Sequence, residues 1–256
     1  MGPHSSWFSL FPGYESLRHN LDFYFGREWT WQVFQATHFE IDHILGGILV
    51  FLVLALLGIR YWHSVYTSGD GGALSPPRFG VRALLETFAD MVYGLMEGPM
   101  GPKNARRYLP LIGTLFLFIL FCNLLSLIPG FLPPTATLKT NVALALLVFV
   151  LTHVFGVAAH GLKYLRHFLG PVLWLAPLML PIEIVSHLAR PVSLSMRLLG
   201  NITADHKVPV VFFAIFPLLL PLPFLVLGVL VAVVQAVVFS LLSTIYIATA
   251  IAHEEH

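Results

Sequence analysis

Charged residues are scarce in this sequence: Asp, Glu, Lys and Arg make up 11% of its 256 residues. A soluble domain carries about 25% charged residues, and the apolar residues here, 57% of the chain, come in long runs. Lipid is therefore the expected solvent for most of the chain. The net charge of +1 gives no electrostatic basis for binding nucleic acid. The single cysteine, Cys122, cannot form an intrachain disulfide, so cysteine usage does not indicate a redox compartment.

The sequence also lacks the motifs of several catalytic classes. It has no glycine-rich P-loop run ending in Gly-Lys-Ser or Gly-Lys-Thr, so nucleotide chemistry is not expected in this chain. No HExxH pair and no cysteine cluster supports a metalloprotease, and no cofactor is expected. No internal repeat points to an inverted-repeat transporter. Residues 1–42 contain no short apolar core typical of a signal peptide, and their Trp and Tyr content predicts an external, interfacial segment.

The apolar runs predict an all-α integral membrane protein with about five membrane helices in a single polytopic domain, residues 43–256. A span needs about 20 apolar residues. Three runs have that length: about 44–62, 108–128 and 142–162. Two later segments, about 171–206 and 209–252, are too long for one simple crossing and contain several prolines. We interpret them as two long, strongly tilted or horizontal helices packed together; two broken hairpins are the alternative.

Residues 79–97 have a different pattern. Apolar side chains recur there every three or four residues, at Leu84, Phe88, Val92 and Leu95. The other positions carry polar side chains, at Arg82, Glu86, Asp90, Tyr93 and Glu97. This spacing predicts an amphipathic helix on the membrane surface, and a small helix packed on a loop is the alternative.

Basic residues set the expected orientation. They concentrate in the loop after the first span, at Arg60, Arg78, Arg82, Lys103, Arg106 and Arg107. Cytoplasmic loops carry the excess of Lys and Arg. We therefore expect the N-terminus outside and the C-terminus in the cytoplasm.

Residues 180–201 combine an apolar background with a polar stripe. At about 100° per residue, six polar side chains fall within roughly 80° of one another: Glu183, Ser186, Arg190, Ser193, Arg197 and Asn201. An arginine at mid-membrane costs at least about 2.5–3.5 kcal/mol, so Arg197 must face protein or water. Glu183 lies about 21 Å from Arg197 along a straight helix, too far for direct pairing. Arginine keeps its proton, so Arg197 is expected to be a permanent cation between separate proton routes.

Other polar residues lie in the apolar runs. Gln235 and Tyr246 share a face of the last helix, and Arg197 is the expected hydrogen-bond partner of Gln235. His153 and His160 share a face of the third span. They fit a water-lined path, haem or metal ligation between helices, or simple interhelical hydrogen bonds. A histidine-bearing membrane cytochrome and an ion transporter are therefore alternative functions.

The run RPVSLSMRLLGNITADH, with LPIE upstream and Gln235 and STIYIA downstream, resembles subunit a of rotary F-type ATP synthases. Three other segments resemble the same family: FCNLLSLIPG around Asn123, EIDHI around Asp42 and the EEH ending. The resemblance covers nearly the whole chain.

This resemblance implies a non-catalytic stator beside a rotating ring of proteolipid c subunits, in a complex with peripheral-stalk b subunits. The protein would be a multi-pass protein of the bacterial inner membrane. Two half-channels would meet the ring, and Arg197 would make each ring carboxylate shed its proton while blocking leakage. Gln235 matches the family's partner of that arginine, Asn201 the asparagine one turn on, and Glu183 a glutamate of the outer half-channel. Whether H⁺ or Na⁺ moves is set mainly by the ring.

Three positions depart from the common bacterial pattern of the family: His206, Gly228 and Ser126. His206 stands where many members have glutamate, and Gly228 where others carry an acid or a histidine. We infer that His206 relays protons with Glu183, aided by Asn123, His153 or ordered water. The remaining candidates for path or support are Ser186, Ser193, His160, Tyr246 and Asp42.

Overall fold

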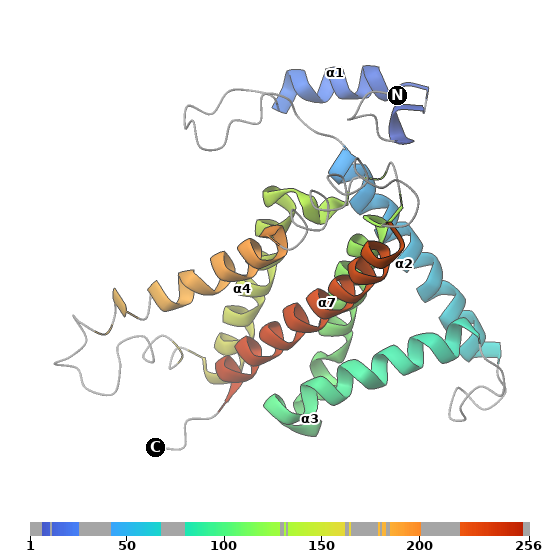
Figure 1. Cartoon of the computed structure of the whole chain (residues 1–256). Helices are drawn as coiled ribbons and strands as arrows, with labels where there is room; N and C mark the ends of the chain where they lie inside the picture. Colours follow the sequence, from blue (N-terminus) through green and yellow to red (C-terminus); the bar gives the residue numbers. More distant parts are fainter. Residues whose placement is uncertain are drawn as a thin grey trace.

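The computed structural model describes the chain as a bundle of helices (Figure 1). Its described residues are 7–10, 12–25, 42–67, 80–128, 131, 133–161, 164, 179, 181–182, 185–200 and 221–252. The named helices are η1 (Trp7–Leu10), α1 (Tyr14–Phe25), α2 (Asp42–Thr67), α3 (Val81–Leu125), η3 (Pro134–Ala136), α4 (Leu138–His160) and α7 (Pro221–Ile251). Residues 185–200 form a further helical segment, and no strand occurs among the residues just given.

Four of these helices are long and apolar enough to cross a membrane: α2, α3, α4 and residues Val226–Ile251 of α7. The all-helical prediction is therefore confirmed for the described residues. Helix α2 contains the predicted span 44–62, and α4 covers most of 142–162. The predicted segment 171–206 is described only at 179, 181–182 and 185–200. The orientation of the ends and the tilt of the last helices stay predictions.

The predicted surface helix and the second predicted span are the two arms of one helix, α3. Gly101 separates them, with φ 73° and ψ 163° inside an otherwise helical stretch. Only glycine adopts this backbone region readily. Pro102 follows and cannot donate the hydrogen bond that would continue the first arm. The chain therefore bends between 81–100, which runs across one end of the bundle in Figure 1, and 102–125, which returns through it.

Apolar side chains of the first arm divide between the core and the outside of the bundle. Val92 is 1% exposed, whereas Leu84 is 45% exposed. Arg82, expected on the polar face, is instead only 7% exposed. Its Nε donates to Glu86 Oε1 at 2.7 Å, four residues along the same helix. The long apolar stem of arginine packs inward while this ion pair holds its charged end.

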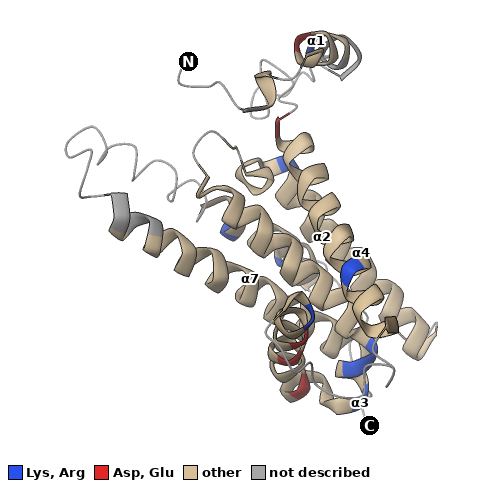
Figure 2. Ribbon diagram, turned by 90° about the vertical axis from the view of Figure 1, so that its right-hand side faces the viewer, with Lys and Arg blue, Asp and Glu red and all other residues tan. Residues whose placement is uncertain are grey.

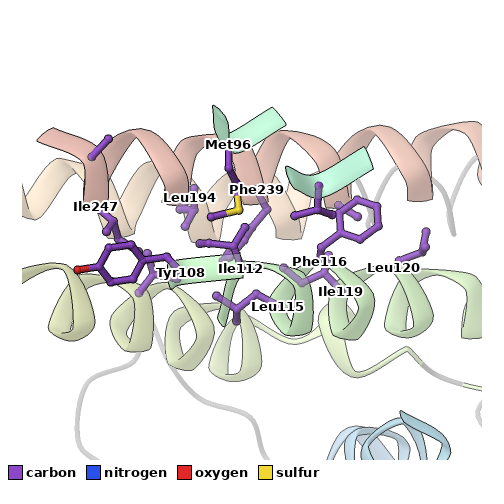
Figure 3. Packing of buried hydrophobic residues seen from close by; sticks show 14 of the residues in the cluster. Met96, Tyr108, Ile112, Leu115, Phe116, Ile119, Leu120, Leu194, Phe239 and Ile247 are labelled. Atoms are coloured by element: carbon purple, nitrogen blue, oxygen red, sulfur yellow. The ribbon is translucent and has the colours of Figure 1, made fainter. Parts of the chain in front are cut away.

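One hydrophobic cluster joins both arms of α3 to α4, residues 185–200 and α7. Figure 3 shows its central members: Met96, Tyr108, Ile112, Leu115, Phe116, Ile119, Leu120, Leu194, Phe239 and Ile247. The α3 members recur at helical spacing. Small residues on α7, Ala232 and Ala236, are buried beside Phe239 and let the helix backbones approach closely.

The outward surfaces of the long helices are apolar. On α2, Phe51, Leu56 and Ile59 are all exposed. Figure 2 marks few acidic or basic residues on α2, α4 and α7 and several acidic residues on the first arm of α3. Exposed apolar area on this scale is typical of a lipid-facing surface.

The N-terminal helices are tied to the bundle by two contacts. The Tyr14 hydroxyl donates to Asp42 Oδ1 at 2.9 Å, which joins α1 to the start of α2. The rings of Phe8 and Phe131 meet edge to face with centroids 5.6 Å apart. Asp42 is only 9% exposed, so its hydrogen bond with Tyr14 is a buried structural contact.

Candidate functional site

Arg197 lies on an outward-facing side of the helical segment 185–200. The exposed residues of this segment recur at helical spacing and define what we call the outer face: Val185, Ser186, Leu188, Ala189, Val192, Ser193, Met196, Arg197 and Gly200. The opposite side packs into the bundle through Leu194 and Leu198, which are 3% and 0% exposed. Ser186, Ser193 and Arg197 share this face. Arg190, which the predicted stripe also included, is instead half-buried, with its guanidinium over the Tyr246 ring.

Arg197 is the one charged residue on the outer face. Within the described part of the chain, its guanidinium makes no ion pair and no hydrogen bond. A lone arginine at membrane depth costs at least about 2.5–3.5 kcal/mol. The outer face is therefore expected to meet a polar or anionic partner that this chain's described residues do not supply.

Gln235 is placed differently from Arg197. It is 2% exposed on α7 and lies next to Ala236, which is fully buried. Other buried polar side chains follow on the same helix. Ser243 donates to the Phe239 carbonyl at 2.8 Å and Thr244 to the Ser240 carbonyl at 2.8 Å. Since Arg197 has no hydrogen bond to a described residue, its pairing with Gln235 stays a prediction.

A second polar cluster surrounds Asn123 at the end of α3. The Thr135 hydroxyl donates to Asn123 Oδ1 at 2.9 Å, and Asn141 Nδ2 donates to the Thr135 carbonyl at 2.8 Å. All three residues are at most 3% exposed. Asn141 Oδ1 is buried and has no partner among the described residues. Sequence reasoning singled out only Asn123, because Thr135 and Asn141 reach it through the turn at η3.

His153 lies at a junction of α4, the 185–200 segment and α7. Its ring centroid is 5.4 Å from that of His187, which is 7% exposed. The Arg190 guanidinium carbon lies 5.1 Å from the centroid of the Tyr246 ring. All four side chains line a cavity of about 10 Å³. Sequence reasoning noted His153 and Tyr246 separately but did not single out His187.

The remaining candidates divide between described and undescribed residues. His160 is half-buried near the end of α4. Glu183, Asn201 and His206 lie outside the described residues. Across the described ranges, no three side chains of the metal-ligating types His, Cys, Asp and Glu come together.

The fold and the outer face define a multi-pass helical membrane protein that presents one arginine away from its own bundle. Comparison with known proteins gives the family. The family model described as ATP synthase A chain matches residues 44–248. The chain belongs to this family, subunit a of the ATP synthase.

Curated relatives agree with the family model. "ATP synthase subunit a 2" of Syntrophotalea carbinolica is 53% identical over 214 residues, 84% of this chain and 87% of the relative. "ATP synthase subunit a 1" of the same organism is 59% identical over 172 residues, 67% of this chain and 73% of the relative. "ATP synthase subunit a" of Geobacter sulfurreducens is 50% identical over 175 residues, 68% of this chain and 76% of the relative.

Proposed function

We propose that this chain is the stator subunit of the ATP synthase membrane sector, and that Arg197 is the fixed cation facing a rotating ring of proteolipid c subunits. The exposed position of Arg197 on an apolar outer face carries the proposal. A ring that passes this face with one carboxylate per subunit would supply the anionic partner that the arginine needs.

The chemistry follows from the permanent charge of arginine. A carboxylate facing a guanidinium favours its ionised form, so a protonated ring carboxyl approaching Arg197 releases its proton. Arginine cannot take up that proton and pass it on, because its own proton is never lost in proteins. Arg197 therefore drives deprotonation of the ring without conducting protons across the contact.

Two proton half-channels must then serve the ring on either side of Arg197. In our proposal Glu183 and His206 carry protons, because carboxyl and imidazole groups change charge readily. Gln235, Asn201 and Asn123 supply polar contacts along the way. Ser186 and Ser193 share the outer face with Arg197 and can hydrogen-bond a ring carboxyl in passing.

The proposed setting is a bacterial inner membrane, with peripheral-stalk b subunits holding the stator in the complex. In Figure 1, α1 and the C-terminal end of α7 lie at opposite ends of the bundle, which supports ends on opposite sides of the membrane. The excess of basic residues after the first span supports placing the C-terminal side in the cytoplasm. No observation among the described residues favours the membrane cytochrome or the separate ion transporter.

The test is proton-driven ATP synthesis in membranes that carry the assembled complex. We expect Arg197→Ala to lower synthesis by at least about 10²-fold, the size of losing one preorganised electrostatic contact. Gln235→Ala should lower it less. Arg60→Ala is the matched control, because Arg60 is an exposed arginine on α2 and should leave synthesis unchanged. ATP synthesis at the wild-type rate by Arg197→Ala membranes would refute the proposal.

A further inference from the structure

Two neighbouring cavities form one groove along α2. The first, about 430 Å³, lies between α2 and the two arms of α3. The second, about 400 Å³, lies between α2, the second arm of α3 and α4. Both are lined by Thr114, and their α2 residues recur at helical spacing on one face: Phe51, Leu54, Ala55, Gly58 and Tyr61. We call this surface the α2 groove.

Two polar side chains in the wall of the α2 groove already have partners in the chain. The Thr114 hydroxyl donates to the Pro110 carbonyl at 2.6 Å. Glu86 Oε1 accepts from Arg82 Nε at 2.7 Å, so its charge is paired. The rest of the lining is mainly apolar. The groove therefore suits an apolar occupant, which would leave these hydrogen bonds intact.

Two glycines on different helices keep the α2 groove open. Gly58 of α2 and Gly113 of α3 both line it. Neither has a positive φ, and a β-carbon at either would meet no described atom within 4 Å. Glycine destabilises a helix interior relative to alanine, and no contact within the described chain requires it here. The glycines therefore point to a bound group that approaches both helix backbones closely.

The length of the α2 groove fits one leaflet of a bilayer. Residues 51–61 of α2 rise about 15 Å, and the hydrocarbon core of a bilayer is about 30 Å thick. The groove runs from near the middle of α2 to the end of the bundle that the first arm of α3 crosses (Figure 1). A transmembrane helix lying in the groove would have to continue past that arm. An acyl chain ends at mid-membrane and fits the groove as it is.

Basic side chains lie at the end of the α2 groove near the bend of α3. Arg106 is exposed and precedes the lining residues Pro110 and Gly113 by four and seven residues, on the same face of the second arm. Lys103 is exposed one turn before Arg106. Basic pockets between membrane helices bind anionic lipid headgroups. The charge at this end of the groove therefore complements a phosphate group.

We propose that the α2 groove binds one acyl chain of an anionic phospholipid, with its phosphate group at Arg106. The chain lies against Gly58 and Gly113 and fills the space between α2 and both arms of α3. Tyr61 lies at the headgroup level, where tyrosine is enriched. This inference goes beyond the proposed function, because it requires neither a ring nor a charge at Arg197.

The experiment uses the purified complex in phosphatidylcholine vesicles that contain phosphatidylglycerol with a photoreactive acyl chain. After irradiation, mass spectrometry of peptides locates the labelled residues. We expect label on the α2 and α3 peptides that line the α2 groove. Gly58→Leu and Gly113→Leu should each lower this labelling at least about tenfold, because a leucine side chain displaces about two buried methylene groups. Gly47→Leu is the control, since Gly47 is an unobstructed glycine of α2 outside the lining.

The headgroup is tested with a second probe, phosphatidylcholine with the same photoreactive chain. Arg106→Gln should lower labelling by phosphatidylglycerol about fivefold, the effect of one basic side chain near a membrane surface. Labelling by phosphatidylcholine should not change.

Three results would overturn the inference. The first is groove labelling that neither leucine variant lowers; the two variants lie on different helices, so each checks the other. The second is phosphatidylglycerol labelling that Arg106→Gln leaves unchanged. The third is a groove without label in the wild-type complex, or one that cross-links to another subunit instead, because a protein helix would then fill it. ATP synthesis by Arg197→Ala membranes tests the proposed function separately.

Discussion

The bend in α3 depends on Gly101, and Gly101→Ala is the sharpest test of the fold. The backbone there has φ 73° and ψ 163°, a region that is essentially restricted to glycine. A β-carbon at this position would meet no atom within 4 Å. The expected cost is therefore backbone strain alone, about 1–3 kcal/mol.

Two helical glycines of the same arm isolate this effect. A β-carbon at Gly94 or Gly98 also meets nothing within 4 Å, and neither has a positive φ. Alanine is favoured over glycine in a helix interior by about 0.8–1.0 kcal/mol. Gly94→Ala and Gly98→Ala should therefore raise thermal stability or leave it unchanged, while Gly101→Ala lowers it.

The assay is thermal unfolding of the purified complex, in which the release of this subunit is measured as the temperature rises. It should be combined with cysteine cross-linking between the two arms of α3. In Gly101→Ala the arms should cross-link less efficiently, because relief of strain opens the bend. Equal stability of all three alanine variants, with unchanged cross-linking, would refute the assignment of the bend to Gly101.

Two further predictions concern polar contacts. Glu86→Ala removes the ion pair that Glu86 makes with the buried Arg82. This should cost about 1–3 kcal/mol, less than for a fully buried pair because Glu86 is 28% exposed. Asp90→Ala, at an exposed position, should be neutral in the same unfolding assay. Asn141→Leu removes the donor to the Thr135 carbonyl and should cost about 1–3 kcal/mol. An unchanged melting temperature would contradict either prediction.

The membrane helices were predictable because lipid imposes a simple requirement. A span must be long and apolar, and the sequence meets this in visible runs. The residues at which the membrane helices end were less predictable. The first span was predicted to end at about residue 62, but α2 continues to Thr67, since long basic and aromatic side chains such as Arg60 and Trp62 reach the interface from within a helix.

The bend in α3 was only half predicted. The amphipathic spacing predicted a surface helix over 79–97, and the apolar run predicted a separate span over 108–128. Periodicity carries no information on whether two helices are joined, so the continuous α3 was not expected. The burial of Arg82 was missed for a related reason, because a helical pattern gives the face of a residue but not the direction of a long side chain.

In the candidate site, too, the face on which a residue lies was predictable, but its contacts with other helices were not. Periodicity placed Ser186, Arg190, Ser193 and Arg197 on one face. The structure has the two serines and Arg197 on the outer face, whereas Arg190 is half-buried, because periodicity does not fix the direction of a long side chain. The meeting of His153 with His187 joins positions on separate helices, so it required the tertiary packing. The links from Asn123 to Asn141 through Thr135 likewise depend on the turn between α3 and α4.

The most direct test of the central claim is a structure of the intact complex that shows what lies against Arg197. The account predicts a proteolipid carboxyl group facing the Arg197 guanidinium, with Ser193 on the same contact face. Arg197 facing lipid, or paired with an acidic residue of its own chain, would contradict it.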